Sequence, residues 1–144
     1  MTLTEARPAD VPALAAILSD WIDATDWMPR IHTREDDLRF VAGMVAQGGV
    51  TVAREGGRVQ GFLAAMGATV RALYVAPEAR RKGVGHALLD RAKTRGDRLD
   101  LWCFQANEEA RAFYEAEGFT EAGRTPGAND EGLPDVRLIW RREE

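Results

Sequence analysis

The sequence predicts an α/β fold in which one mixed sheet carries helices on both of its faces. Segments with strand and helix periodicity follow one another in the order β-α-α-β-β-β-α-β-α-β-β, which is typical of a layered domain. The segment LDLWCF at 99–104 is apolar on both faces, as expected for a strand covered on both sides. The 144 residues are the ordinary size of one domain and show no linker or internal repeat. We therefore expect a single domain over residues 1–144.

The chain is expected to open with a strand over residues 2–7 and a helix from Val11 to about Ala24. Asp10 stands directly before this helix and is expected to be its N-cap. The next segment, TDWMPRIHT at 25–33, has no clean period and contains a proline, so we expect an ordered loop there.

A second helix is expected to begin at a capping box formed by Thr33 and Asp36 and to end near Gly48. Its expected inward residues are Leu38, Val41, Ala42 and Val45. Beyond Gly48 the period changes to that of strands.

Strands and one helix make up the middle of the chain. The segments VTVAR at 50–54 and RVQGFLAAM at 58–66 are joined by a glycine-rich turn, which predicts a β-hairpin. A further strand over about 69–76 leads to a helix that begins after Gly83 and ends at Gly96. The apolar residues that this helix should bury are Val84, Ala87, Leu88 and Ala92.

The last part of the chain begins with the strand 99–104 and continues with a helix capped by Asn107 and stopped by Gly118. The inward residues expected on that helix are Ala110, Phe113 and Tyr114. Two strands follow at 119–124 and 136–140, and a polar loop joins them.

Net charge, cysteine count and the length of the apolar runs exclude several classes of protein. A net charge of −4 argues against a nucleic-acid binder that works by neutralising phosphates. The single cysteine, Cys103, excludes an internal disulfide and cannot build a thiolate metal site alone, so no metal is expected and the thiol is taken as inert. No apolar run approaches the about 18 residues of a membrane helix, and the first residues do not resemble a secretory signal. We expect a cytoplasmic protein with no membrane partner.

The stretch LYVAPEARRKGVGHALL, residues 73–89, joins a strand to a helix and holds the parts of a phosphate cradle. A helix N-terminus offers backbone N–H groups without internal partners and a partial positive charge. Gly83 and Gly85 would let a ligand approach the backbone, although Gly83 could equally serve only a tight turn. The mobile cations of this stretch are Arg80, Arg81 and Lys82.

Two better-known phosphate-binding motifs do not match this stretch. A P-loop needs Lys and Ser or Thr after its glycines, but Val84 and Gly85 follow Gly83. The dinucleotide fingerprint needs Gly or Ala where Leu88 stands. What remains is the pattern Arg80-x-x-Gly83-x-Gly85 after a strand.

This pattern resembles the pyrophosphate motif of the GCN5-related N-acetyltransferase (GNAT) superfamily, which reads Gln/Arg-x-x-Gly-x-Gly/Ala. A second family signature is an Asn that leads a helix with an aromatic pair and a final Gly-Phe. Asn107, the pair Phe113-Tyr114 and the dipeptide Gly118-Phe119 match that signature. The stretch LWCFQAN before the helix is also similar to a group of small bacterial GNAT proteins.

The resemblance implies a mostly antiparallel sheet in which two central parallel strands splay apart and receive acetyl-CoA. Backbone groups of Leu73, Tyr74 and Val75 would hydrogen-bond the pantetheine arm, and Asn107 would do so from the other wall or serve only as a helix cap. The residues implied for the pyrophosphate are Arg81, Lys82, Gly83, Val84, Gly85 and His86, with only the backbone of His86 in use.

Direct transfer from a thioester to an amine needs a neutral amine and a protonated leaving group. An amine like that of lysine is neutral in roughly one molecule in a thousand at pH 7. The resemblance implies Tyr114 as the acid that protonates the CoA sulfur, with core packing as the alternative role. The strand TVRALYV lacks the carboxylate that many relatives use as a base, and a water chain to Glu78 or His32 is the substitute to consider.

The resemblance places the acceptor between the loops 25–33 and 125–135. Candidate acceptor residues in the first loop are Trp27, Met28, Arg30 and His32. An alternative is that Trp27 and Ile31 only plug the edge of the sheet. Two groups of acidic residues could attract a cationic amine or form solvated faces: Glu35, Asp36 and Asp37, and separately Asp130, Glu131 and Asp135.

The sequence thus predicts an acetyl-CoA-dependent N-acetyltransferase that acts on a primary amine of a small molecule or a peptide. A CoA-binding sensor of the same fold, without efficient turnover, is the alternative; the missing strand carboxylate favours it slightly, whereas the intact Tyr114 opposes it. A homodimer is expected by resemblance, and nucleic acid is not expected as a partner.

Overall fold

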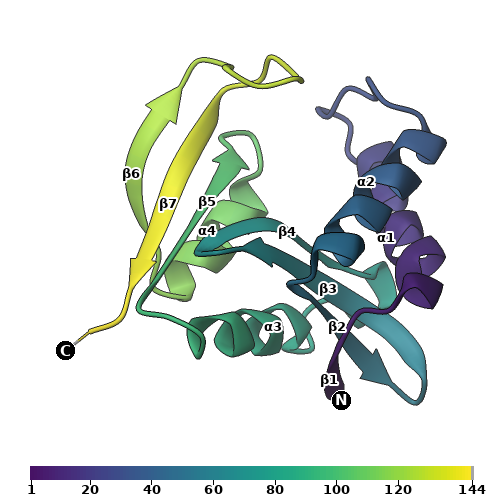
Figure 1. Ribbon diagram of the computed structural model, residues 1–144. Helices are drawn as coiled ribbons and strands as arrows, with labels where there is room; N and C mark the ends of the chain where they lie inside the picture. The colour runs from purple at the N-terminus through teal and green to yellow at the C-terminus, as the bar shows by residue number, and fades with distance from the viewer. Residues whose placement is uncertain (144) are drawn as a thin grey trace.

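The computed structural model describes residues 1–143, which form one open sheet with helices on both faces (Figure 1). The strand order is β1-β2-β3-β4-β5-β7-β6, and the β4–β5 pair is parallel while the others are antiparallel. The strands are β1 (Thr2–Glu5), β2 (Val50–Glu55), β3 (Arg58–Met66), β4 (Thr69–Val75), β5 (Arg98–Phe104), β6 (Thr120–Thr125) and β7 (Asp135–Arg141). The predicted mixed, mostly antiparallel sheet is confirmed.

The helices divide between the two faces of the sheet (Figure 1). The α-helices are α1 (Val11–Ala24), α2 (Arg34–Gln47), α3 (Val84–Lys93) and α4 (Glu108–Ala116), and short 3₁₀ turns precede α1 and α3. One apolar core joins α1 and α2 to β2, β3 and β4. The other joins α3 and α4 to the opposite face, including β5 and β7. No helix within residues 1–143 is long and apolar enough to cross a membrane.

The parallel strands β4 and β5 meet at one end only. The register pairs Thr69 with Asp100, and Asp100 donates its backbone N–H to Ala68 at 2.9 Å. Beyond that point the strands diverge toward Val75 and Phe104, so the splay expected from the resemblance is present (Figure 1).

The buried face of α2 differs from the prediction. Asp37, Val41 and Met44 are its buried residues, whereas Leu38 is 43% exposed. Asp37 is accommodated because it accepts hydrogen bonds from Ser19 at 2.6 Å and from Arg30 at 3.0 Å. The capping box of Thr33 and Asp36 is confirmed.

Helix α1 spans the predicted residues, and Asp10 is its N-cap residue as expected. Its side chain makes no cap hydrogen bond to α1, because the carboxylate accepts from the backbone N–H of Arg7 at 2.8 Å and from the guanidinium of Arg54 at 2.6 Å. The carboxylate thereby closes the 3₁₀ turn Pro8–Asp10.

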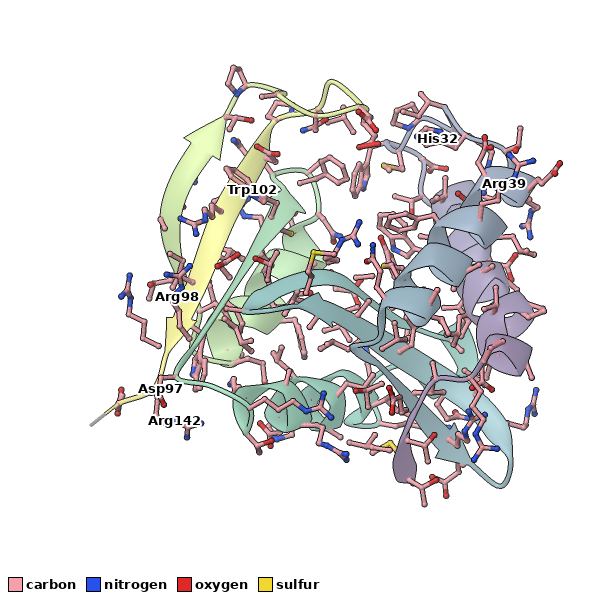
Figure 2. The ribbon with its side chains drawn as sticks, in the orientation of Figure 1. His32, Arg39, Asp97, Arg98, Trp102 and Arg142 are labelled. Atoms are coloured by element: carbon pink, nitrogen blue, oxygen red, sulfur yellow. The ribbon has the colours of Figure 1, made fainter. Side chains whose placement is uncertain are left out.

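Strand β5 is not covered on both sides as its apolar sequence suggested. Trp102 is 53% exposed, because α1 and α2 cover the neighbouring strands β2 to β4 but do not extend over β5. Figure 2 shows Trp102 and Arg98 along this strand, away from α1 and α2.

Candidate active site

An open cleft of about 540 Å³ lies where β4 and β5 diverge. The N-terminal turn of α3 and the helix α4 complete its walls. The predicted residues that line it are Leu73, Tyr74, Val75, Arg80, Arg81, Gly83, Val84, Gly85, His86, Asn107 and Tyr114. The cleft therefore gathers residues from both sequence motifs, and Lys82 is the member of the predicted cofactor set that does not line it.

The turn before α3 has the backbone of an anion site. Arg81 (φ 62°) and Gly83 (φ 82°) are both left-handed, and Gly83 is the N-cap without a side-chain cap. The first helical bond runs from Ala87 N–H to the Gly83 carbonyl at 3.0 Å, which leaves the preceding N–H groups of the helix free. Alternating backbone conformations of this kind form a concave nest of N–H groups for an anion.

The two glycines of the motif have different roles. Nothing lies within 4 Å of the place that a side chain of Gly83 would take. A Cβ on Gly85 would lie 3.2 Å from the ring of Phe113 on α4. Gly85 thus lets α3 and α4 pack closely, and the space beside it belongs to Phe113 rather than to a ligand.

Asn107 caps α4 and also lines the cleft. Its Oδ1 accepts a hydrogen bond from the backbone N–H of Ala110 at 3.1 Å. Within residues 1–143 its amide nitrogen has no protein partner, so both donors of that group face outward from the cap. The cap role predicted as an alternative is confirmed, and it leaves the amide able to bind a ligand.

Tyr114 lies on the cleft wall and is 9% exposed. The rings of Phe113 and Phe119 hold it, with centroids 5.2 Å and 5.4 Å away. Burial, with smaller contributions from Cys103 and Tyr74, raises the pKa of the Tyr114 hydroxyl above its ordinary value. The hydroxyl is therefore protonated at neutral pH, and no residue within 1–143 hydrogen-bonds it. Since no fully buried polar side-chain atom there lacks a partner, the Tyr114 oxygen is open to the cleft and free to donate.

Cys103 also lines the cleft. Burial raises the pKa of its thiol to about 11, so the thiolate is scarce at neutral pH. This agrees with the prediction of an inert cysteine.

The four residues predicted for the acceptor do not line the cleft itself. Trp27 packs on Phe104, with ring centroids 5.8 Å apart, and Met28 is half-buried beside it in the loop. Arg30 binds the loop to the helices through Asp23, Asp37 and the Ser19 carbonyl. His32 lies 3.9 Å from Asp130 of the β6–β7 loop, so the two loops approach each other (Figure 2).

Sequence reasoning missed Trp21, which lines the cleft from the end of α1. Its ring packs on Tyr74 with centroids 5.4 Å apart. The helical period assigned Trp21 to the buried face of its helix, and no signal in the sequence separated a core tryptophan from one that borders a cleft.

The two residues that the sequence offered as a base do not lie in the cleft, whose lining does include the carboxylate of Glu109 on α4. Strand β4 carries no carboxylate, and neither Glu78 nor His32 lines the cleft. Both are exposed, so each could act only through water.

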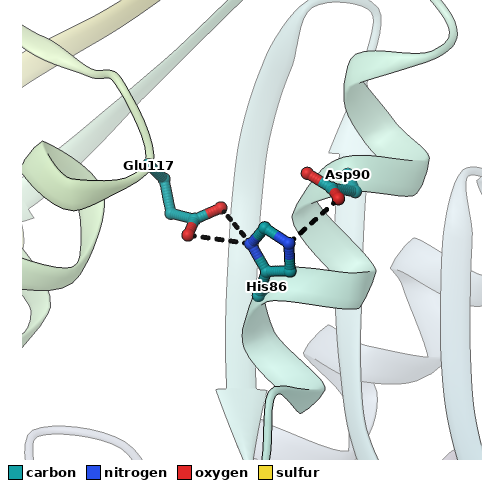
Figure 3. A group of neighbouring side chains, drawn as sticks. All are labelled: His86, Asp90 and Glu117. Carbon is teal, nitrogen blue, oxygen red and sulfur yellow. Dashed lines mark hydrogen bonds and ion pairs between the residues drawn. The ribbon is translucent and has the colours of Figure 1, made fainter.

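His86 uses its side chain, contrary to the prediction that only its backbone matters. Nδ1 lies 2.8 Å from Glu117 Oε1 and Nε2 lies 3.1 Å from Asp90, as Figure 3 shows. The two carboxylates face opposite nitrogens of the ring (Figure 3). The arrangement is a clamp that joins the first turn of α3 to the end of α4.

A splayed parallel pair, an anion nest at a helix N-terminus and a protonated phenol together define the cleft of a CoA-dependent acyltransferase. The sequence model of a family described as "Acetyltransferase (GNAT) domain" matches residues 46–121. Peptidyl-lysine N-acetyltransferase YiaC of Escherichia coli is 36% identical over 118 residues, which cover 78% of this chain and 81% of YiaC. The chain belongs to the GNAT family of acetyltransferases.

Solved structures agree on the fold. The apo-form of YjaB from Escherichia coli has a TM-score of 0.80 at 24% identity, with 99% of this chain and 100% of that chain covered. The yncA protein of Salmonella typhimurium, solved with acetyl-CoA, has a TM-score of 0.75 at 22% identity, with 100% and 95% covered. The protein is an N-acetyltransferase that uses acetyl-CoA as its acetyl donor, and the alternative of a non-catalytic CoA sensor is not supported.

Proposed function

We propose that this protein transfers the acetyl group of acetyl-CoA directly to the side-chain amine of a lysine in a peptide or protein. The similarity to YiaC, a peptidyl-lysine N-acetyltransferase, supports this acceptor class. The cleft supports direct transfer, because it is open at the diverging ends of β4 and β5 and both substrates could meet there.

In this proposal the cofactor is held along two walls. Backbone groups of Leu73 to Val75 hydrogen-bond the pantetheine arm, since β5 does not pair with them there. The pyrophosphate binds the N–H groups of Arg81 to His86, with Arg80 and Lys82 adding positive charge near it. The free amide of Asn107 contacts the arm from α4.

The reaction then proceeds without a covalent enzyme intermediate. The amine loses its proton to water, and its nitrogen attacks the thioester carbonyl carbon. The new C–N bond forms as the C–S bond breaks, and the departing sulfur takes the proton of the Tyr114 hydroxyl. The acylated nitrogen then releases its second proton to water, and the Tyr114 phenolate regains a proton from water. Tyr114 is a buried residue on the cleft wall whose hydroxyl has no hydrogen-bond partner within residues 1–143 and is open to the cleft, and this position is the observation that carries the proposal.

Replacing Tyr114 with Phe tests this role. Removal of a general acid should lower kcat by about 100-fold, while the KM for acetyl-CoA changes by less than about threefold. The measurement is thiol release from acetyl-CoA with a lysine peptide as acceptor. An unchanged kcat would show that Tyr114 only packs in the core.

Two further expectations complete the proposal. We propose a cytoplasmic location, as the sequence predicted, and a homodimer in solution, which only the resemblance to the family suggested. Sedimentation of the purified protein tests the second, and a monomer at micromolar concentration would contradict it.

A further inference from the structure

The side chains of His86 and Glu117 connect two helices that form opposite parts of the cleft wall. His86 belongs to the first turn of α3, whose backbone N–H groups form the anion nest. Glu117 is the C-cap residue of α4, the helix that carries Tyr114. Nδ1 of His86 lies 2.8 Å and 2.9 Å from the two carboxylate oxygens of Glu117 (Figure 3). Because an ionised carboxylate can only accept, the ring donates this hydrogen bond from Nδ1.

Glu117 is held firmly at the end of α4. Its side chain is only 12% exposed. Its backbone N–H donates to the carbonyls of Phe113 and Tyr114, both at 3.1 Å, and its own carbonyl accepts from Lys93 of α3 at 2.6 Å. His86 is therefore linked to the turn of α4 that holds Tyr114 through a single intermediate residue.

The opposite nitrogen of the His86 ring makes a contact of a different kind. Nε2 lies 3.1 Å from Asp90, one turn further along the same helix. Both of these side chains are more than half exposed. An exposed pair within one helix contributes little and joins no second element. The contact with Glu117, and not the one with Asp90, thus links the two helices.

Close packing beside His86 makes this link sensitive to distance. The residue before it, Gly85, faces the ring of Phe113, and a Cβ there would lie 3.2 Å from that ring. The backbone of α3 and a side chain of α4 are therefore in direct contact next to the hydrogen bond. A loss of that bond would allow the first turn of α3 to move away from α4.

In the proposed function, one acetyl-CoA molecule contacts both helices. Its pyrophosphate lies at the nest of α3, and its arm and sulfur lie near Asn107 and Tyr114 of the α4 wall. The covalent structure of the cofactor limits how far apart these contacts can be. A misplacement of about 1 Å can lower the rate of a reaction about 100-fold. The spacing of α3 and α4 must therefore match the cofactor.

We propose that His86 is a positioning residue whose side chain, bound to Glu117, sets the spacing between the anion nest of α3 and the α4 wall with Asn107 and Tyr114. The inference rests on the proposed function, which supplies the cofactor contacts and the acid. It deepens that function by assigning a role to the His86 side chain in addition to its backbone.

Calorimetric titration with CoA tests the link without an acceptor. His86→Ala and Glu117→Ala should each weaken CoA binding by about three- to tenfold, the range of one lost hydrogen bond. The double variant should bind no worse than the weaker single variant. Glu117→Gln should recover most of the loss, because its amide oxygen still accepts from Nδ1. EDTA in every titration excludes a metal ion held by His86, Asp90 and Glu117 as the cause.

Asp90→Asn is the matched control, because it removes the other carboxylate of the same ring. Its CoA affinity should stay within about twofold of wild type. Equal losses in Asp90→Asn and Glu117→Ala would overturn the inference, as would losses that add in the double variant. His86 is 58% exposed, so His86→Ala leaves the core intact even where Glu117→Ala weakens the end of α4.

A second cycle asks whether His86 acts through Tyr114. With a peptide that contains one lysine and a blocked N-terminus, His86→Ala should lower kcat about tenfold in the wild-type background. It should lower kcat less than about twofold in the Tyr114→Phe background, because the placement of an absent acid has no effect. Where Tyr114→Phe itself lowers kcat, an equal loss in both backgrounds would overturn the positioning of the acid. An inactive wild type, or an unchanged kcat in Tyr114→Phe, would contradict the proposed function, and the CoA titrations would still decide the role of His86.

Discussion

Asp100 occupies the one point at which β4 and β5 are paired. Its carboxylate accepts from Thr69 of β4 at 2.8 Å and from Arg98 at 2.7 Å, and Arg137 of β7 lies 3.5 Å away. Burial works against the charged form, but the hydrogen bonds from Arg98 and Thr69 outweigh it and lower the pKa of Asp100. One side chain thus ties together the two halves of the sheet just where they begin to separate.

Replacing Asp100 with Asn should reduce the free energy of unfolding by about 1–2 kcal/mol at neutral pH. Because the folded-state pKa is lowered, this contribution is present above the unfolded pKa and is lost as pH falls through the folded value. The difference in free energy of unfolding between wild type and variant should therefore be constant from about pH 7 to 5 and shrink below about pH 4. Denaturant unfolding across this range measures it.

Asp97→Asn is the matched control for this variant. Asp97 is 91% exposed and pairs with Arg142, so its removal should change stability by less than about 0.5 kcal/mol. If the loss of unfolding free energy in Asp100→Asn did not depend on pH down to about pH 3, the role assigned to the charge of Asp100 would be contradicted.

At the scale of elements, the turn into α3 determines whether the N–H groups of that helix are available. Gly83 holds a left-handed conformation at the N-cap, and the space beside it is open. The clamp of His86 between Glu117 and Asp90 then fixes the first turn of α3 relative to α4. A change at Gly83 therefore acts on backbone conformation alone.

Gly83→Ala should lower the free energy of unfolding by about 1–2 kcal/mol, because a left-handed conformation is costly for a residue with a Cβ. It should also weaken acetyl-CoA binding about tenfold, since the nest of N–H groups depends on that conformation. Thermal unfolding and calorimetric titration measure the two effects. Gly96→Ala, at an exposed glycine without a positive φ, should change both by little, and an equal loss in the two variants would refute the argument.

Local signals in the sequence predicted the elements and their caps well. Thr33 and Asp36 form the expected capping box of α2, and Asn107 caps α4 as expected. Both caps could be predicted because capping depends on residues three positions apart. The burial of Asp37 could not be predicted, since Ser19 is 18 residues away in the chain. The place of Trp21 in the cleft could not be predicted for the same reason, because its contact with Tyr74 joins residues far apart in the chain.

At the scale of the whole molecule, the sheet consists of two parts that share a single parallel pairing. The antiparallel strands β1 to β4 lie on one side and β5, β7 and β6 on the other, and the cleft lies between them (Figure 1). A cofactor in the cleft would supply to β4 the hydrogen bonds that β5 does not. Binding of acetyl-CoA and completion of the sheet are therefore one event in this account.

Backbone amide hydrogen exchange with and without acetyl-CoA tests this account most directly. We expect the cofactor to slow exchange most at residues 73–75 and 84–86, and little in β1 and β2. A second hollow, lined by Met44, Gly49 and Met66, lies elsewhere on the molecule and provides an internal comparison. Slowing centred on that hollow, with residues 73–75 unchanged, would contradict the assignment of the splayed strands as the acetyl-CoA site.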